Sequence, residues 1–149
     1  MVQQLSILGS TGSIGVQTLD IVRANPQLFS VQSLAAGKNW RLLARQAREF
    51  SPRRIAICDK DCFPALKDAL KDLPIEVLAG EEAVSGLAAD VEVDMVVNAI
   101  VGYAGLHPTL AALQSGHKLA LANKESLVVG GELVMRTAQE KGLQILPID

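Results

Sequence analysis

The sequence contains few aromatic residues, no excess of basic residues and no long uninterrupted hydrophobic run. Only 3% of its 149 residues are aromatic, and the formal net charge is −2. Proteins that bind nucleic acid usually present a basic stripe or an aromatic platform, so we expect no nucleic-acid partner. No apolar run reaches the roughly 18 residues that a membrane-spanning helix requires. We therefore expect no membrane association.

Cysteine is also scarce, because only Cys58 and Cys62 are present. They stand four positions apart, with no histidine or further cysteine beside them. Metal binding or a disulfide stays open, but a reduced structural pair is the favoured interpretation. The first apolar run begins almost at Met1, which leaves no room for a signal or transit peptide. Both observations predict a reducing, cytoplasmic location.

Short apolar runs alternate with segments of helical periodicity along the whole chain. This alternation predicts an α/β fold, a Rossmann-like, doubly wound, mostly parallel sheet with helices on both faces. The predicted strands are an apolar run at 5–8 and the segments 29–36, 54–58, 76–78, 95–100, 118–122 and 144–148. The predicted helices are 13–24, one marked by Trp40, Leu43, Ala44 and Ala47, and the segments 61–73, 82–88, 106–114 and 131–141.

Three glycines, Gly9, Gly12 and Gly15, stand three apart between the first predicted strand and the first predicted helix. This order is typical of the phosphate-binding turn of a nucleotide-binding βαβ unit. The first glycine can adopt backbone angles that a side chain forbids, the second admits a diphosphate, and the third lets the helix lie against the strand. The helix N-terminus would then face the diphosphate. Because the spacing is not the commoner G-x-G-x-x-G, a glycine-rich turn without a ligand stays open.

The end of the second predicted strand points to the kind of dinucleotide. An NAD-binding unit usually carries an acid about 20 residues after the glycines. Here Gly37, Lys38 and Asn39 occupy that place, and the nearest downstream acid is Glu49. Lys38 and the Asn39 amide would attract a 2′-phosphate, which predicts NADP rather than NAD. Alternatively, Asn39 simply caps the next helix, and both interpretations can hold together.

Polar residues also follow the predicted strand 118–122, at Asn123, Lys124 and Glu125. In an open parallel sheet, ligands collect at the carboxyl ends of the strands. Lys124 can place its charge on a developing oxyanion or a phosphate. The alternative is that these are solvated turn residues.

Three further residues are weaker candidates. His107 stands beside Pro108 at a predicted helix start and His117 precedes a predicted strand, so we interpret both as surface or capping residues. Asp149 follows the last predicted strand and shares an edge with Lys124. A single carboxylate does not hold Mg²⁺ or Mn²⁺ alone.

Five blocks of the sequence, in this order, resemble the 1-deoxy-D-xylulose 5-phosphate reductoisomerase family. They are Gly9–Gly15 (GSTGSIG), Ala36–Asn39 (AGKN), Asn98–Gly102 (NAIVG), Ala120–Val128 (ALANKESLV) and Pro147–Asp149 (PID). The resemblance implies that residues 1–149 are the NADPH-binding amino-terminal domain of a metal-dependent enzyme of non-mevalonate isoprenoid biosynthesis. It also implies that the catalytic and carboxy-terminal domains are absent, so the 149-residue fragment alone is expected to be inactive.

The resemblance implies the following contacts with NADPH: Thr11, Gly12, Ser13 and Ile14 at the diphosphate, Gly37, Lys38 and Asn39 at the 2′-phosphate, and Asn123 and Glu125 elsewhere. It implies that Lys124 is the catalytic residue that contacts the substrate and that Asp149 is a ligand of Mg²⁺ or Mn²⁺. The implied reaction converts 1-deoxy-D-xylulose 5-phosphate to 2-C-methyl-D-erythritol 4-phosphate, in a full-length homodimer. Two other classes stay open: an NADP-dependent dehydrogenase of the homoserine or semialdehyde type, without metal dependence, and a non-catalytic dinucleotide-binding module.

Overall fold

The computed structural model describes residues 1–122 and 124–148, with the side chains of 1–122 and 130–148. The strands of this part are β1 (Gln3–Leu8), β2 (Phe29–Ala36), β3 (Arg54–Ile57), β4 (Glu76–Ala79), β5 (Met95–Asn98), β6 (Lys118–Leu121) and β7 (Ile145–Pro147). Its helices are α1 (Ser13–Ala24), α2 (Trp40–Phe50), α3 (Phe63–Ala69), α4 (Glu81–Ala88), α5 (Leu106–Gln114) and α6 (Lys124–Lys141). Two 3₁₀ turns, η1 (Lys60–Cys62) and η2 (Tyr103–Gly105), precede α3 and α5.

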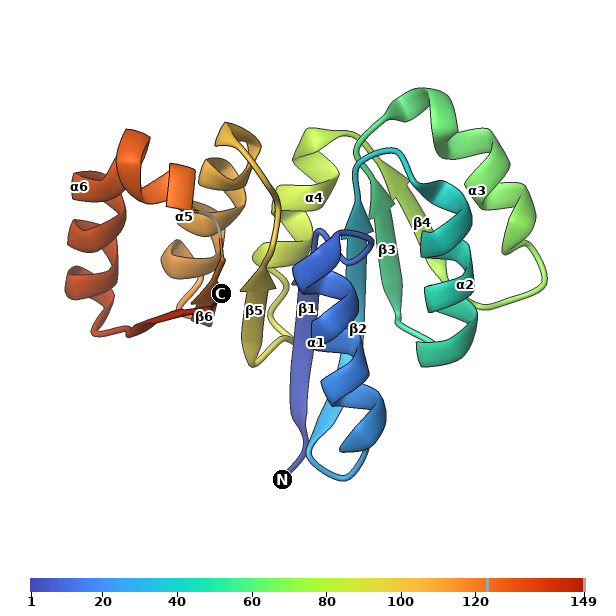
Figure 1. The fold of residues 1–149 in the computed structure, drawn as a ribbon, viewed down its shortest axis with the longest axis horizontal. Coiled ribbons are helices and arrows are strands. Elements are labelled where there is room, and N and C mark those ends of the chain that lie inside the picture. Colours follow the sequence, from blue (N-terminus) through green and yellow to red (C-terminus); the bar gives the residue numbers. More distant parts are fainter. Residues whose placement is uncertain (123, 149) are drawn as a thin grey trace.

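The strands form one sheet in the order β4-β3-β2-β1-β5-β6-β7 (Figure 1). Each pair of neighbouring strands in the described part is parallel. The chain winds outward from β1 to β4 and then returns to place β5 on the other side of β1. The predicted Rossmann-like, doubly wound fold is therefore confirmed, and the switch in winding direction lies between β1 and β5.

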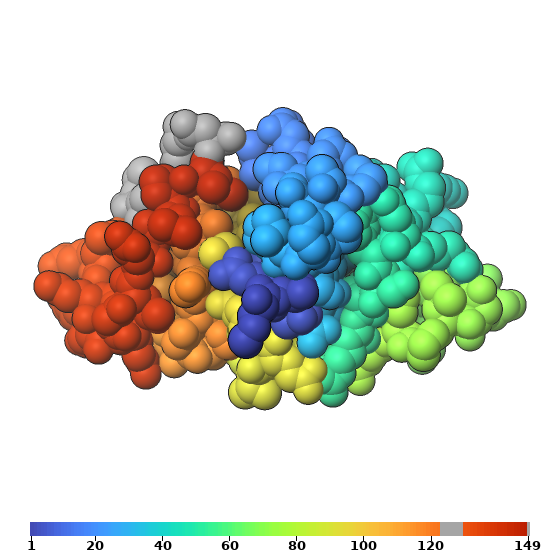
Figure 2. Space-filling model, turned by 90° about the horizontal axis from the view of Figure 1, so that it is seen from below, coloured from blue at the N-terminus to red at the C-terminus, as the bar shows by residue number. Residues whose placement is uncertain are grey.

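Helices cover both faces of the sheet, as the sequence predicts. One apolar core contains Leu19 of α1, Leu43 of α2 and Leu66 of α3. The other contains residues of α4, α5 and α6, such as Leu87 and Leu113. Because each face of the sheet meets a helical layer, both sides of the central strands are largely apolar. Figure 2 shows the amino-terminal segment (blue) at the centre of one face, between the carboxy-terminal part (orange and red) and the green segments.

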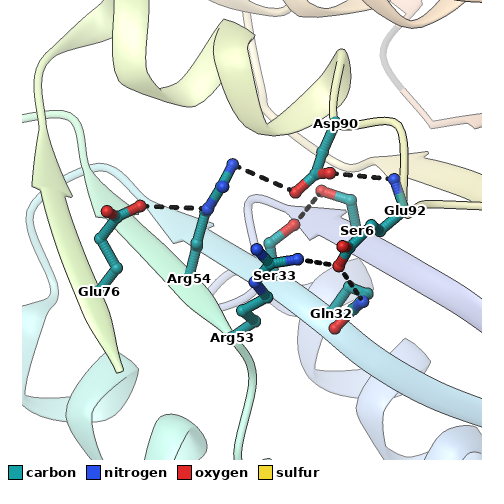
Figure 3. Close-up of polar contacts among 8 residues, drawn as sticks. All are labelled: Ser6, Gln32, Ser33, Arg53, Arg54, Glu76, Asp90 and Glu92. Carbon is teal, nitrogen blue, oxygen red and sulfur yellow. Dashed lines mark hydrogen bonds and ion pairs between the residues drawn. The ribbon is translucent and has the colours of Figure 1, made fainter. Parts of the chain in front are cut away.

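Ion pairs join the amino ends of β3, β4 and the loop before β5. Arg54 lies 3.1 Å from a Glu76 oxygen and 3.4 Å from an Asp90 oxygen, and Arg53 pairs with Glu92 (Figure 3). The more exposed of these pairs, Arg53–Glu92 and Arg54–Glu76, contribute roughly 0–1 kcal/mol each. They lie at the sheet edge opposite the glycine turn.

A bulge in β2 brings two serines together inside the core. Leu5 pairs with Val31 but Ser6 pairs with Ser33, so one residue of β2 is left out of register. The Ser33 hydroxyl then donates a hydrogen bond to the Ser6 hydroxyl across 2.6 Å, and both residues are fully buried (Figure 3). This contact links the first two strands independently of their backbone hydrogen bonds.

Several predicted elements are shorter than expected, among them the helix 61–73 and the strand 95–100. The predicted helix 61–73 is a 3₁₀ turn followed by α3, which ends at Ala69. Its last residues form successive turns instead, and Leu73 N lies 3.0 Å from Leu70 O. Proline disfavours a helical residue before it, so the chain has left the helix ahead of Pro74. The predicted strand 95–100 ends at Asn98, and Ile100 N donates to the Asn98 side chain across 3.2 Å.

The predicted helix 131–141 begins earlier than expected, at Lys124. The element comprises two helical segments that meet at a kink at Gly130, whose φ is −116° and ψ 18°. A Cβ on Gly130 would lie 2.5 Å from Leu106 Cδ1, so the absence of a side chain at Gly130 allows α6 to approach α5 closely. The segment after the kink corresponds to the prediction. Among the described helices, none combines the length and apolarity needed to cross a membrane.

We expect Ser33→Ala to lower the free energy of unfolding by about 1–3 kcal/mol, since it removes a hydrogen bond from a dry interior. Ser6→Ala should have a similar effect. The double variant should lose less stability than the sum of the two single variants, because both remove the same contact. Urea denaturation of the four proteins measures this coupling. Strictly additive losses would show that the two hydroxyls do not act as a pair.

Candidate functional site

The glycine turn after β1 holds three backbone segments close together. Gly9 has a φ of +79°, a conformation that favours glycine, as its place in the motif predicts. A Cβ on Gly9 would lie 2.7 Å from the carbonyl carbon of Ala99, in the loop after β5. Gly9 N and Ser10 N each lie 2.9 Å from Ala35 O, at the end of β2. The turn is thus fixed against both strands that flank β1.

The other two glycines of the motif have different surroundings. A Cβ on Gly15 would lie 2.1 Å from Gly9 O and 2.6 Å from Ser10 Cα. Gly15 therefore lets α1 pack against the glycine turn. The motif predicts that this glycine lets the helix lie against the strand, and the contact found is with the turn that directly follows the strand. A Cβ on Gly12 would meet only Gly9 O, at an ordinary 3.6 Å, within the described part of the chain. The space beside Gly12 is open, as a main chain that approaches a ligand requires.

The N-terminus of α1 retains donors for an anion. Gly12 is its N-cap residue, and no side chain of the described residues caps it there. The first N–H groups of a helix have no partner within the helix, and the helix dipole places partial positive charge at that end. Ser13 and Ile14 are the first two residues of α1, so their backbone lies at this N-terminus. Their side chains do not line the cavity described below.

A cavity of about 460 Å³ opens beside the glycine turn, over the carboxyl edge of the sheet. Its wall includes five of the predicted site residues, Thr11, Gly12, Gly37, Lys38 and Asn39. The rest of the wall comes from the ends of β2 and β3, from α4 and from the segment after β5, and includes Cys58, Glu81, Val84, Ser85, Ile100, Val101, Ala104, His107 and Pro108. In doubly wound folds, ligands bind outside the strand ends at the switch point. The cavity adjoins this point.

The segment after β2 lies exposed at the cavity wall. Asn39 Oδ1 accepts a hydrogen bond from Leu42 N across 3.2 Å and so caps α2, as the alternative interpretation predicts. No ion pair of the described residues involves Lys38. The ammonium group of Lys38 is thus available to a ligand. The predicted contact of both residues with a 2′-phosphate stays a prediction.

The two cysteines lie next to this segment. Both belong to the described residues, and both are free and half-buried, as expected for a reduced pair. Burial, together with the carboxylates of Glu81 and Asp59, raises the pKa of the Cys58 thiol. Cys58 is therefore a neutral wall residue at pH 7. The Cys62 thiol lies 3.6 Å from Lys38 O and donates to it, which ties the exposed segment to η1.

Asn98 holds the opposite side of the cavity. Its side chain is fully buried, and Nδ2 donates to Gly105 O across 2.9 Å and to Thr109 Oγ1 across 2.8 Å. Its Oδ1 accepts from Ile100 N, so Asn98 is bonded both to the segment between β5 and α5 and, through Thr109, to α5 itself. In the sequence, Asn98 stands out only as part of a family block. To predict its hydrogen bonds, one must know where α5 lies, and the residues next to Asn98 in the sequence do not give this position.

The histidines behave differently from one another. His107 is exposed, as expected, but it also lines the cavity from the first turn of α5. His117 is only 8% exposed, so its interpretation as a surface residue is wrong. The residue lies between the end of α5 and the start of β6, and its backbone N donates to Ala112 O of α5 across 3.0 Å. Its Nε2 has no hydrogen-bond partner among the described residues.

Four predicted site residues fall wholly or partly outside this description. Asn123 and Asp149 lie outside the described residues. Lys124 and Glu125 are the first two residues of α6, and their side chains also lie outside the described part. They begin a helix rather than extending a turn from β6. Among the described residues, no group of three or more histidine, cysteine, aspartate or glutamate side chains could hold a metal ion.

Comparison with known proteins agrees with this geometry. The family model for 1-deoxy-D-xylulose 5-phosphate reductoisomerase matches residues 5–131. The protein of that name from Porphyromonas gingivalis is 50% identical over 149 residues, which are 100% of this chain and 39% of the relative. The chain therefore spans well under half the length of the curated relatives that it matches.

Solved structures show the same likeness. A DOX-P reductoisomerase in complex with NADPH, fosmidomycin and magnesium is 44% identical, with a TM-score of 0.95 over 99% of this chain and 36% of that one. The reductoisomerase from Zymomonas mobilis in complex with NADPH is 39% identical, with a TM-score of 0.95 over 100% of this chain and 39% of that one. A homoserine dehydrogenase from Thiobacillus denitrificans, 20% identical with a TM-score of 0.59 over 98% of this chain and 29% of that one, shares the fold alone. With an open glycine turn at the switch point and a family model that covers most of its length, the chain belongs to the 1-deoxy-D-xylulose 5-phosphate reductoisomerase family.

Proposed function

We propose that this chain is the NADPH-binding region of a metal-dependent reductoisomerase that converts 1-deoxy-D-xylulose 5-phosphate to 2-C-methyl-D-erythritol 4-phosphate in isoprenoid biosynthesis. The observation that carries this proposal is the cavity at the glycine turn, whose wall contains both Gly12 and the Lys38 segment. Two solved relatives that match this chain with a TM-score of 0.95 are complexes with NADPH. Because the chain spans 39% of its relative's length, catalysis is assigned to the longer protein.

The parts of NADPH would occupy the cavity in the following order. The diphosphate would lie beside Gly12, against the N–H groups and the positive dipole end of α1. The adenosine would occupy the largely apolar part of the wall, which includes Val84 and Pro108. The 2′-phosphate would lie at Lys38 and Asn39, where a charge-assisted hydrogen bond from the ammonium group is available.

One acid does line the cavity, although it is far away in the sequence. Glu81 begins α4 and forms part of the wall. It follows β4 rather than β2, so it does not occupy the place of the acid that usually holds the ribose of NAD. The residues at that place remain Gly37, Lys38 and Asn39. The charge nearest to the 2′-phosphate position would therefore be positive.

The metal ion would be held mainly outside the described residues. A carboxylate is a suitable ligand for Mg²⁺ or Mn²⁺. Asp149, which comes after β7 in the sequence, would supply one. A bound divalent ion would stabilise negative charge on substrate oxygens, and NADPH would supply the hydride for reduction. Lys124, at the start of α6, would orient the substrate by its charge. The remaining ligands and the closure over the substrate would come from the longer protein.

The alternatives have less support. The likeness to a homoserine dehydrogenase concerns the fold alone, so it does not favour a dehydrogenase of the homoserine or semialdehyde type. A non-catalytic dinucleotide-binding module would require the longer protein to lack the metal-dependent reaction. The homodimer of the full-length protein and its cytoplasmic location stay predictions.

We expect calorimetry on this chain to show tighter binding of NADPH than of NADH. Lys38→Asp should narrow or reverse this preference, by about 10- to 100-fold, the usual effect of one charge-assisted hydrogen bond. The matched control is Lys118→Asp, the same charge reversal at the start of β6. It should leave the preference unchanged. Equal affinity of the unmodified chain for the two dinucleotides would contradict the assignment of the Lys38 segment.

The glycine turn generates a second prediction. Gly12→Val should abolish dinucleotide binding with little change in melting temperature, because the new side chain meets open space in the protein but occupies the position of the diphosphate. Gly15→Ala should instead lower the melting temperature, since its Cβ would lie 2.1 Å from Gly9 O. Calorimetry and thermal melting of both variants separate these effects. Retained binding by a folded Gly12→Val protein would show that the diphosphate lies elsewhere.

A third prediction concerns catalysis. The 149-residue chain should bind NADPH but should not oxidise it when 1-deoxy-D-xylulose 5-phosphate and Mg²⁺ or Mn²⁺ are added. In the longer protein, Asp149→Asn should remove most of the turnover and leave NADPH affinity nearly unchanged, because the metal ion would bind the substrate and not the dinucleotide. Absorbance at the NADPH band follows the reaction. Metal-dependent oxidation by the 149-residue chain would overturn the assignment of catalysis to the missing part.

A further inference from the structure

We infer that Gln46 is a positioning residue for the diphosphate site, because it holds the backbone of the glycine turn through Ser10. The inference rests on the dinucleotide-binding function proposed above. Ser10 Oγ donates to Gln46 Oε1 across 2.8 Å, and Gln46 Nε2 donates to Ser10 O across 2.9 Å. Ser10 is fully buried and Gln46 is 6% exposed. The two residues thus form a reciprocal clamp between α2 and the turn.

The clamp is unusual for the face of α2 on which Gln46 lies. The other buried residues of this helix are Leu43, Ala44 and Ala47. A buried amide costs free energy unless its polar atoms are bonded, and here both ends of the amide are bonded to one residue. An apolar side chain of similar volume would fill the same space without a desolvation cost. What Gln46 adds is therefore a fixed position for Ser10.

The clamp completes the bonding of Ser10. Its backbone N lies 2.9 Å from Ala35 O, so its N–H, its carbonyl and its hydroxyl all have partners. Thr11 and Gly12 follow directly and line the cavity. Binding sites lose less free energy to ordering when their loops are held in place beforehand. Gln46 itself does not line this cavity, so it acts through Ser10.

The same helix also carries the other end of the site. Asn39 caps the N-terminus of α2, and Lys38 precedes it. Gln46 lies seven residues further on, about two helical turns or 10 Å along the axis. One rigid element therefore connects the 2′-phosphate segment to the glycine turn and sets the separation between the two. Loss of the clamp should lower the affinity for ligands that contact the glycine turn. It should leave unchanged the affinity for ligands that contact only the 2′-phosphate segment.

The test compares two probes on this chain: NADPH, and adenosine 2′-monophosphate, which has no diphosphate. Gln46→Met keeps the volume and removes both hydrogen bonds. We expect this variant to bind NADPH with an affinity lower by about tenfold or more, as the loss of one to two hydrogen bonds implies. The affinity for adenosine 2′-monophosphate should change by less than about twofold. Ser33→Ala, which breaks a buried hydroxyl pair away from the cavity, is the control for lost stability and should change neither affinity.

A double-mutant cycle with Ser10→Ala adds a second readout. If Gln46 and Ser10 act as one unit, each single variant loses binding free energy for NADPH by breaking the same contact. The loss in the double variant of Gln46→Met and Ser10→Ala should then be smaller than the sum of the two single losses. Should Gln46→Met fail to fold, Gln46→Glu replaces it, since its carboxylate still accepts from Ser10 Oγ and should give an intermediate loss. Unchanged NADPH affinity, or equal losses for both probes, would overturn the positioning role. Absence of NADPH binding by the unmodified chain would instead overturn the proposed function.

Discussion

The contact of three backbone segments at Gly9 is the constraint on which the rest of the site depends. The end of β1, the loop after β5 and the first turn of α1 meet here at distances that a side chain would prevent. Gly9 leaves room for Ala99, and Gly15 leaves room for the carbonyl of Gly9. As a result, α1 begins directly above the point where the winding of the sheet reverses. The cavity opens at this point because the helices that follow β1 and β5 leave toward opposite faces.

Two buried amides hold the two sides of the cavity in place. Gln46 bonds the glycine turn on the α2 side, and Asn98 bonds the loop after β5 on the α5 side. An amide can donate and accept at once, so each can satisfy several backbone groups in a dry interior. Both amides lie in the otherwise apolar layers, where unsatisfied groups would be costly. Neither amide lines the cavity, so both hold segments of its wall from outside it.

Local patterns in the sequence predict much of this fold. The bounds of α1 and β2 agree with those predicted, because glycine, proline and apolar spacing lie within the segments themselves. The positive φ of Gly9 and the cap of Asn39 likewise depend on near neighbours. The predictions are wrong where distant parts decide. Gly130, at the kink of α6, lies against Leu106, and the backbone of His117 is bonded to α5. Glu81 and the clamp of Ser10 by Gln46 could not be predicted, since the partners lie far apart in the sequence.

The most direct measurement is an NMR titration of the isotope-labelled chain with NADPH. The account predicts that backbone amide signals shift at residues 9–14, at 37–39 and in the segment 99–107, which contain or adjoin residues of the cavity wall. Signals of Arg53 and Glu92, at the opposite edge of the sheet, should stay in place. Shifts confined to that opposite edge, or none in the glycine turn at saturating NADPH, would contradict the claim that this cavity binds the dinucleotide.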